Sequence, residues 1–139
     1  MTKPKTSDQY LVRGFGNNAK GQFAEAIVDF SKAIEINPND IDHYLRKEDA
    51  YEGRANAKGD LEDYVGAVSD FSKVIELNPK DEDTFLGDAY LMRGISKVYL
   101  EDYESAFSDF NKAIELNPKD AEAYYYLRQK RGYYKNHPM

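Results

Sequence analysis

The chain has 139 residues, a formal net charge of −6 and no cysteine, and it contains 12 tyrosines and 7 phenylalanines. The lack of cysteine excludes disulfide bonds and thiolate metal sites, and the mildly acidic balance argues against a general nucleic-acid-binding protein. No apolar run approaches the ~18 residues of a membrane span, and the N-terminal stretch lacks an apolar signal segment. We therefore expect a cytoplasmic protein with a single domain over residues 1–139.

The first two predicted elements are helices over residues 7–20 and 23–36. The second carries an apolar stripe at three- and four-residue steps, the pattern of an amphipathic helix. Its members are Phe23, Ala26, Ile27, Phe30, Ala33 and Ile34. Asp29 and Lys32 lie off the stripe, and we expect both to face water. The helix ends before Pro38, because the residue preceding proline is disfavoured in helical conformation.

The same two-helix pattern then occurs twice more. DFSKAIEINP at residues 29–38 returns as DFSKVIELNP at 70–79 and as DFNKAIELNP at 109–118. A tyrosine stands 28 residues before each final proline, at Tyr10, Tyr51 and Tyr90, and an arginine follows three residues later each time. Fixed offsets in three copies indicate internal repeats. Their approximate bounds are 7–38, 48–79 and 87–118.

The segments that join the repeats are longer than the repeats require. From Pro118 to the next repeat tyrosine is six residues, whereas the two earlier segments span 13 and 11. We expect the extra residues to lengthen the next helices, giving 40–58 and 83–99, each followed by a partner at 62–77 and 102–116. Longer loops are the alternative. In the second segment Leu86, and not Phe85, would share the face of Tyr90.

The last predicted element is a helix over residues 120–134, with Asp120 as its N-cap. Its inner face is expected to consist of Tyr124, Leu127 and the stem of Arg131. The remaining tyrosines have no obvious role in the core, and tyrosine is enriched in interfaces. A weak homodimer is therefore predicted, formed largely through residues 120–135. The tyrosines expected to mediate it are Tyr126, Tyr133 and Tyr134.

The repeated pattern Y-x2-R-[GA] … [YF]-x2-A-x3-F-x2-[AV]-x4-P resembles the tetratricopeptide repeat over about residues 7–118. The resemblance implies an all-α fold, a right-handed superhelix of antiparallel helix pairs with three repeats and a C-terminal capping helix. It also implies a scaffold that binds a protein or peptide segment and performs no chemistry of its own.

Nothing in the sequence indicates an active site. The two histidines, His43 and His137, have neither metal-ligand nor relay spacing, and the phosphate-loop motif is absent. Carboxylates such as Asp29, Asp70 and Asp109 recur at one repeat position, which favours a structural role. We therefore predict no catalytic residue, no cofactor and no metal.

In the resembling family, the first helix of each pair lines a concave groove. Carried over, the expected groove residues are Asp8, Leu11, Phe15, Asn18, Asp49, Glu52, Asn56, Asp88, Leu91, Ile95, Tyr99, Glu122 and Tyr125. The position two before each repeat tyrosine is acidic four times, which favours a ligand with Lys or Arg beside apolar residues. The alternative is that these acids only stabilise early helical turns.

Some family members grip the C-terminal carboxylate of chaperone tails with a clamp of Lys, Arg and Asn. The basic clamp positions correspond here to Leu11, Asp88 and Met92, so chaperone-tail binding is not expected. Two other functions stay open: assembly of copies through the tyrosine-rich C-terminal helix, and nucleic-acid contact through the basic, aromatic C-terminus. The second is the least favoured because the chain is acidic.

Overall fold

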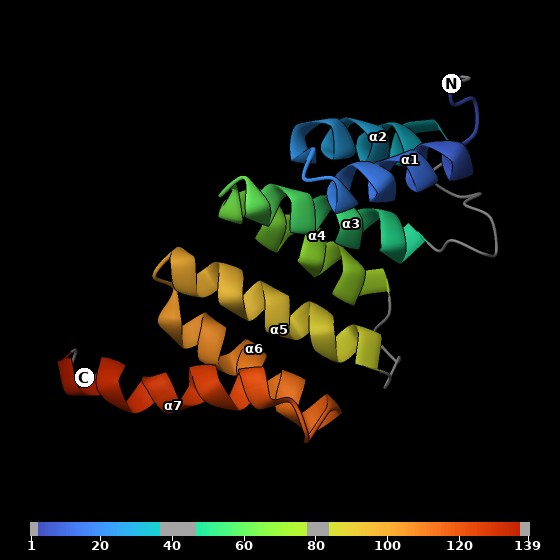
Figure 1. The fold of residues 1–139 in the computed structure, drawn as a ribbon. Helices are drawn as coiled ribbons and strands as arrows, with labels where there is room; N and C mark the ends of the chain where they lie inside the picture. The colour runs from blue at the N-terminus through green and yellow to red at the C-terminus, as the bar shows by residue number, and fades with distance from the viewer. Residues whose placement is uncertain (1–2, 37–46, 78–83, 137–139) are drawn as a thin grey trace. The chain divides into compact units, whose positions relative to one another are not determined.

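The computed structural model describes residues 3–36, 47–77 and 84–136, and the described part is helical throughout apart from short turns (Figure 1). The helices are α1 (Ser7–Ala19), α2 (Phe23–Ile36), α3 (Lys47–Asp60), α4 (Tyr64–Leu77), α5 (Thr84–Tyr99), α6 (Tyr103–Leu116) and α7 (Ala121–Asn136). The predicted all-α class and the order of helices are confirmed.

The chain divides into two compact units, residues 1–77 and 78–139. The N-terminal unit contains the first two repeats, in which α1 packs on α2, α2 on α3, and α3 on α4. The C-terminal unit contains the third repeat and the terminal helix, in which α5 packs on α6 and α6 on α7. The expectation of a single domain over 1–139 stays a prediction.

The two helices of each repeat are joined by the same tight turn. Eleven residues after the repeat tyrosine, Gly21, Glu62 and Glu101 have left-handed backbone angles, with φ of 75°, 64° and 61°. The next residue donates its amide to a carbonyl five residues back, as Gln22 does to Asn17 at 2.8 Å. This arrangement satisfies the last carbonyls of the helix and reverses the chain. Only the first repeat uses glycine, the residue best suited to this conformation.

Phe30 is the centre of the N-terminal unit and is fully buried. Its ring lies against Gly14 of α1 on one side and Gly53 of α3 on the other. A methyl group on Gly14 would come within 2.9 Å of the ring, so the absence of a side chain at both positions allows the helices to approach. One aromatic ring therefore joins two repeats.

The C-terminal unit repeats this arrangement with a different partner. Phe110 of α6 is fully buried and lies against Gly94 of α5. On its other side Tyr126 of α7 stacks on it, with ring centroids 5.0 Å apart and planes 10° from parallel. Ala123 of α7 is fully buried in the same cluster.

The inner face of α7 differs from the prediction. It consists of Ala123, Tyr126 and Leu127, whereas Tyr124 is exposed. The reason is that small Ala123 brings the helix close to α6, and the residues three and four positions later then share its face. The side chain of Arg131 lies outside the described residues.

The lengthened-helix prediction is confirmed for the second joining segment. Helix α5 begins at Thr84, six residues before Tyr90, while α1 begins three residues before its tyrosine. Leu86 is buried and Phe85 only half-buried, as its spacing from Tyr90 requires. In the first joining segment, residues 40–46 of the predicted helix lie outside the described residues.

Candidate functional site

The recurring aspartate of each repeat is part of the scaffold. Asp29, Asp70 and Asp109 are all buried, and each pairs with the arginine 16 residues before it. The N–O distances are 2.8, 2.8 and 2.7 Å. The expectation that Asp29 faces water is therefore wrong, because α1 lies over it and supplies a guanidinium. The signal was available in the fixed Arg–Asp spacing of the three repeats.

Each of these arginines also lies over the repeat tyrosine, with the guanidinium carbon 5.4–5.6 Å from the ring centroid. The hydrogen bond to Asp109, and then its negative charge, raise the pKa of Arg93, although burial opposes this. A second cation, Lys97, reaches Asp109 at 2.9 Å. This network fixes the helix pair and occupies the carboxylate with two cations.

The expected groove residues of the N-terminal unit fall into two groups. Leu11 is fully buried in the core, so it offers no surface to a ligand. Phe15 is partly exposed and packs edge-to-face on Phe30, with centroids 4.9 Å apart. Asn18 is half-buried and donates its amide to the carbonyl of Gly53 at 3.1 Å, which ties α1 to α3. The others, Asp8, Asp49, Glu52 and Asn56, are half-buried.

In the C-terminal unit, Tyr99, Tyr125 and Tyr126 form what we call the tyrosine patch. Tyr99 is 61% exposed and Tyr125 53% exposed. The ring of Tyr125 meets that of Tyr126 edge-on at 5.3 Å. Burial raises the pKa of Tyr126, and the neighbouring Tyr99, Glu122 and Tyr125 raise it further. The patch thus brings together two predicted groove residues and one that was assigned to a dimer interface.

The remaining predicted positions in this unit lie around the patch. Leu91 is buried in the core, and Ile95 is half-buried beside it. Asp88 and Glu122 are exposed. Although Asp88 is exposed, neighbouring residues shield its carboxylate from part of the solvent, and this desolvation, followed by the charge of Asp120, raises the pKa of Asp88 above its ordinary value. Carboxylates of α5 and of the start of α7 therefore lie close enough to repel one another.

The predicted N-cap is confirmed, because Asp120 accepts a hydrogen bond from the backbone amide of Ala123 at 3.1 Å. This bond satisfies an otherwise unpaired amide at the start of α7. Two roles thus meet in Asp120, which caps the helix and adds negative charge beside Asp88.

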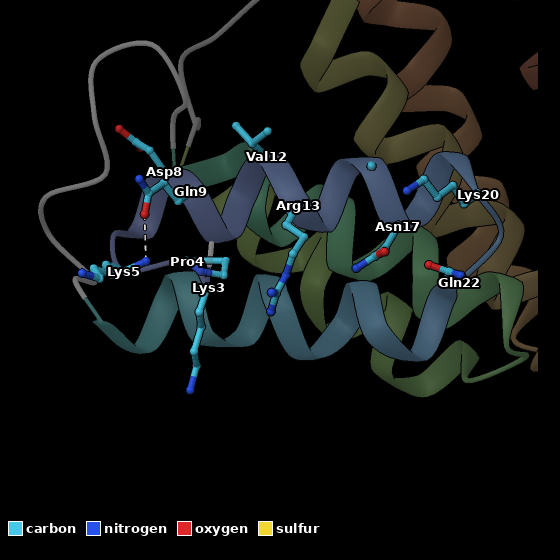
Figure 2. A pocket seen from close by; sticks show the side chains of 11 residues that line it. Lys3, Pro4, Lys5, Asp8, Gln9, Val12, Arg13, Asn17, Lys20 and Gln22 are labelled. Carbon is cyan, nitrogen blue, oxygen red and sulfur yellow. Dashed lines mark hydrogen bonds between the residues drawn. The ribbon is translucent and has the colours of Figure 1, made fainter. Parts of the chain in front are cut away.

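A cavity of about 830 Å³ runs along the outer side of α1. Figure 2 shows Val12 and Arg13 of α1 among its lining side chains, together with Lys3, Pro4 and Lys5 from the segment before the helix. The sequence carries no signal for this cavity, since a hollow on a helix flank depends on what the neighbouring elements leave uncovered. We call the lining residues of α1 at positions 9, 12 and 16 the α1 outer stripe.

The described residues contain neither a metal-binding cluster nor a membrane-spanning helix. No cluster of three or more His, Cys, Asp or Glu side chains there is placed to hold a metal ion. No helix in the same part of the chain is long and apolar enough to cross a membrane. The two histidines lie outside the described residues.

Comparison with known proteins identifies the repeat. A tetratricopeptide repeat model matches residues 18–40 and 87–120. The TPR domain of Arabidopsis OM64 superposes with a TM-score of 0.77 at 24% identity, covering 92% of this chain and 96% of that one. No curated protein matches the chain.

Two further solved structures contain peptides. The first TPR of Spaghetti (RPAP3), bound to the HSP90 peptide SRMEEVD, has a TM-score of 0.75 at 24% identity and covers 92% of both chains. The second TPR domain of human RPAP3, in complex with the HSP70 peptide SGPTIEEVD, has a TM-score of 0.71 at 22% identity, covering 86% of this chain and 90% of that one.

Proposed function

Because this chain belongs to the tetratricopeptide repeat family, we propose that it is a protein-interaction scaffold without chemistry of its own. Its ligand is a protein or peptide segment, bound within the C-terminal unit on exposed side chains of α5 and α7. The observation that carries the proposal is the tyrosine patch of the C-terminal unit, which lies on α5 and α7.

The patch has the character of a binding surface. Tyrosine rings offer large apolar area at a small cost in side-chain entropy, and their hydroxyls remain available for hydrogen bonds. Tyr126 is fixed by stacking on Phe110, and it holds Tyr125 in an edge-on arrangement. A rigid aromatic surface loses little freedom when a ligand binds, which favours affinity.

The charges nearby indicate which ligand fits. Asp88 already bears an unfavourable interaction with Asp120, so a cationic group placed between them would relieve it. We therefore propose a segment in which Lys or Arg stands next to Leu, Ile or Phe. The two peptides bound by the similar structures are acidic at their C-terminal ends. In this chain the corresponding clamp positions hold buried Leu11, acidic Asp88 and Met92.

The test uses short displayed peptides that pair Lys or Arg with Leu, Ile or Phe, measured beside SRMEEVD against the full chain. We expect the basic peptides to bind and SRMEEVD not to. Replacing both Tyr99 and Tyr125 with Ser should weaken binding at least about tenfold. Tyr124→Ser is the matched control, because Tyr124 is an exposed tyrosine of the same helix outside the patch. Preference for SRMEEVD, or equal binding by both variants, would contradict the proposal.

The homodimer, the cytoplasmic location and the nucleic-acid contact remain predictions. Tyr126 is packed on Phe110 within its own unit, and the side chains of Tyr133 and Tyr134 lie outside the described residues. The weak homodimer is tested by sedimentation at several concentrations, and the cytoplasmic location by cell fractionation. Nucleic-acid contact through the C-terminus is tested by titration with a labelled single-stranded oligonucleotide.

A further inference from the structure

The position two residues after the repeat tyrosine contacts an aromatic ring in α3 and in α7. In the N-terminal unit it is Gly53 of α3, which lies against the ring of Phe30 of α2. In the C-terminal unit it is Tyr126 of α7, which stacks on Phe110 of α6. Gly53 and Tyr126 differ greatly in size, yet each contacts the phenylalanine of the preceding helix. In α3 and α7, whose preceding helix belongs to the same unit, this position therefore contacts an aromatic ring of that helix, whereas Met92 holds it in α5 and is 36% exposed.

In the first repeat this position is Val12, and its apolar side chain is 63% exposed. The positions on either side give the same contrast. Ala50 and Ala57 of α3 are fully buried, whereas their counterparts on α1 line the cavity. One of these, Gly16, has open space where a side chain would stand. The α1 outer stripe thus has the form of a helix-packing face that no other described helix of its unit covers.

The stripe is held in place before any ligand arrives. The backbone amide of Lys5 donates to Oε1 of Gln9 at 2.8 Å, and this bond is drawn in Figure 2. Thr6 caps the helix, and the hydroxyl of Ser7 donates to the carbonyl of Ala33 at 3.0 Å. Pro4 is buried. The segment before α1 therefore forms a fixed wall of the cavity, which lowers the cost of binding.

The charge of the cavity is opposite to that of the whole chain. Lys3, Lys5 and Lys20 line it, although the chain carries a net charge of −6. Arg13 also lines it but is paired with Asp29 at 2.8 Å. Asp8 is the one acid among the lining residues. Complementary charge favours encounter with a negatively charged partner and disfavours a positively charged one.

We propose that the α1 outer stripe is a docking site for an acidic amphipathic helix of a partner protein. The helix places an aromatic ring against Val12, as Phe30 lies against Gly53, and its carboxylates face the three lysines. The proposal is independent of the tyrosine patch, because the stripe belongs to the N-terminal unit and uses other residues.

The probe for the test is a synthetic peptide with the sequence of residues 23–36, FAEAIVDFSKAIEI. It contains three carboxylates, one lysine and the Phe30 ring that packs in the equivalent place on α3. A side-chain staple on its polar face is needed, since isolated helices of this length are marginal in water. Fluorescence anisotropy with the full-length chain should give a sub-millimolar dissociation constant that weakens with added salt.

Val12→Glu should weaken binding at least about tenfold. Val65→Glu is the matched control, because Val65 is a helical valine of the same unit with 68% exposure and lies outside the cavity. A peptide in which Ala replaces the second Phe should bind the intact chain as weakly as the original peptide binds the Val12→Glu variant. If Val12→Glu fails to fold, Gly16→Leu fills the same cavity from an open position and should have the same effect.

Three results would overturn the proposal. The first is no binding to the intact chain at 1 mM. The second is equal binding by the Val12→Glu and Val65→Glu variants. This result is expected if the peptide displaces α2, whose sequence it shares, and packs on α3 in its place. The third is a homodimer of the intact chain that Val12→Glu dissociates in sedimentation, because the occupant would then be a second copy.

Discussion

Asp29 in the first repeat and Asp109 in the third are both buried, but the groups that neutralise them differ. Asp109 is contacted by Arg93 and Lys97. Asp29 is contacted by Arg13 and by the side-chain amide of Asn17 at 2.8 Å. The position seven residues after the repeat tyrosine thus holds a cation in the third repeat and a neutral amide in the first.

The arginine that pairs with the aspartate is also more exposed in the first repeat than in the third. The side chain of Arg13 is 42% exposed, whereas that of Arg93 is 18% exposed. Asn17 and Arg13 line the α1 cavity, so the Arg13–Asp29 pair is more accessible to solvent than the Arg93–Asp109 pair. Among the described residues, the buried aspartate therefore has two cationic partners in the third repeat, and only one in the first repeat, where the cavity exposes the flank of α1.

The largest expected effect comes from deleting the shared carboxylate. Asp109→Ala leaves Arg93 and Lys97 mostly buried without their anion, and breaking such a pair costs about 3–5 kcal/mol. Asp29→Ala should cost clearly less, because Arg13 can reach water. Urea unfolding of both variants measures the difference, and equal losses would remove the contrast between the two repeats.

A second test concerns the close packing that both units share. Ala67 is fully buried against Ala55 and Phe71, at the repeat position of Ala26 and Ala106. Ala67→Leu overpacks this contact and should cost roughly 1–3 kcal/mol. Exposed Ser69 provides the control through Ser69→Ala, and thermal unfolding should separate the two variants. Equal melting temperatures would show that the contact tolerates bulk.

Exchanging the residue that differs between the two networks sharpens the comparison. Lys97→Asn removes one cation from the Asp109 network and should cost about 1 kcal/mol. Asn17→Lys gives the first repeat the pair found in the others and should be neutral or slightly stabilising, since the lysine can also remain in water. Chemical denaturation of the two variants measures this, and a large loss in Asn17→Lys would show that the amide is required.

The inter-helix turns give a smaller effect. Glu62→Gly and Glu101→Gly place glycine at left-handed positions, as Gly21 already does, and each should stabilise by about 0.5–1 kcal/mol. Gly21→Glu should destabilise by a similar amount. Differential scanning calorimetry resolves such shifts. If all three substitutions lower stability, the side chains of the glutamates contribute more than the backbone strain costs.

The smallest effect is electrostatic. The pKa of Asp88 is raised in the folded chain, so the folded state holds this proton more tightly than the unfolded state. Stability should therefore fall slightly as pH rises from about 3.8 through the raised pKa. Binding of a basic peptide should strengthen over the same interval, because the carboxylate becomes charged. Asp88→Asn should flatten this dependence and Glu35→Gln, an exposed acid of α2, should not.

The sequence predicted helix positions well because the signals are local. Helix α2 has the predicted bounds 23–36, and α4 and α6 begin within two residues of prediction. Apolar periodicity and the Asn–Pro stops depend only on neighbours along the chain. The face of α7 was predicted wrongly, since Tyr126 is placed by a ring on another helix.

The candidate sites were less predictable because they depend on contacts between residues far apart in the sequence. The family register assigned Leu11 and Leu91 to a groove, but both are buried in the hydrophobic cores of their units. Asp29 was expected in water because the helical stripe ignores what α1 contributes from 16 residues away. No sequence pattern within the first repeat predicts the cavity along α1. The exposed Val12 differs from its counterparts Gly53 and Tyr126, which pack on aromatic rings.

The position of Phe30 between Gly14 and Gly53 also has a consequence for cooperativity. Opening either the first or the second repeat would expose the same ring to water. The free energy of unfolding one repeat therefore includes a contact with the other. The interior amides of α1, α2 and α3 should therefore exchange with deuterium through a common opening event. Enlarging Gly53 to Ala should loosen all three helices together, although the substitution lies in only one of them.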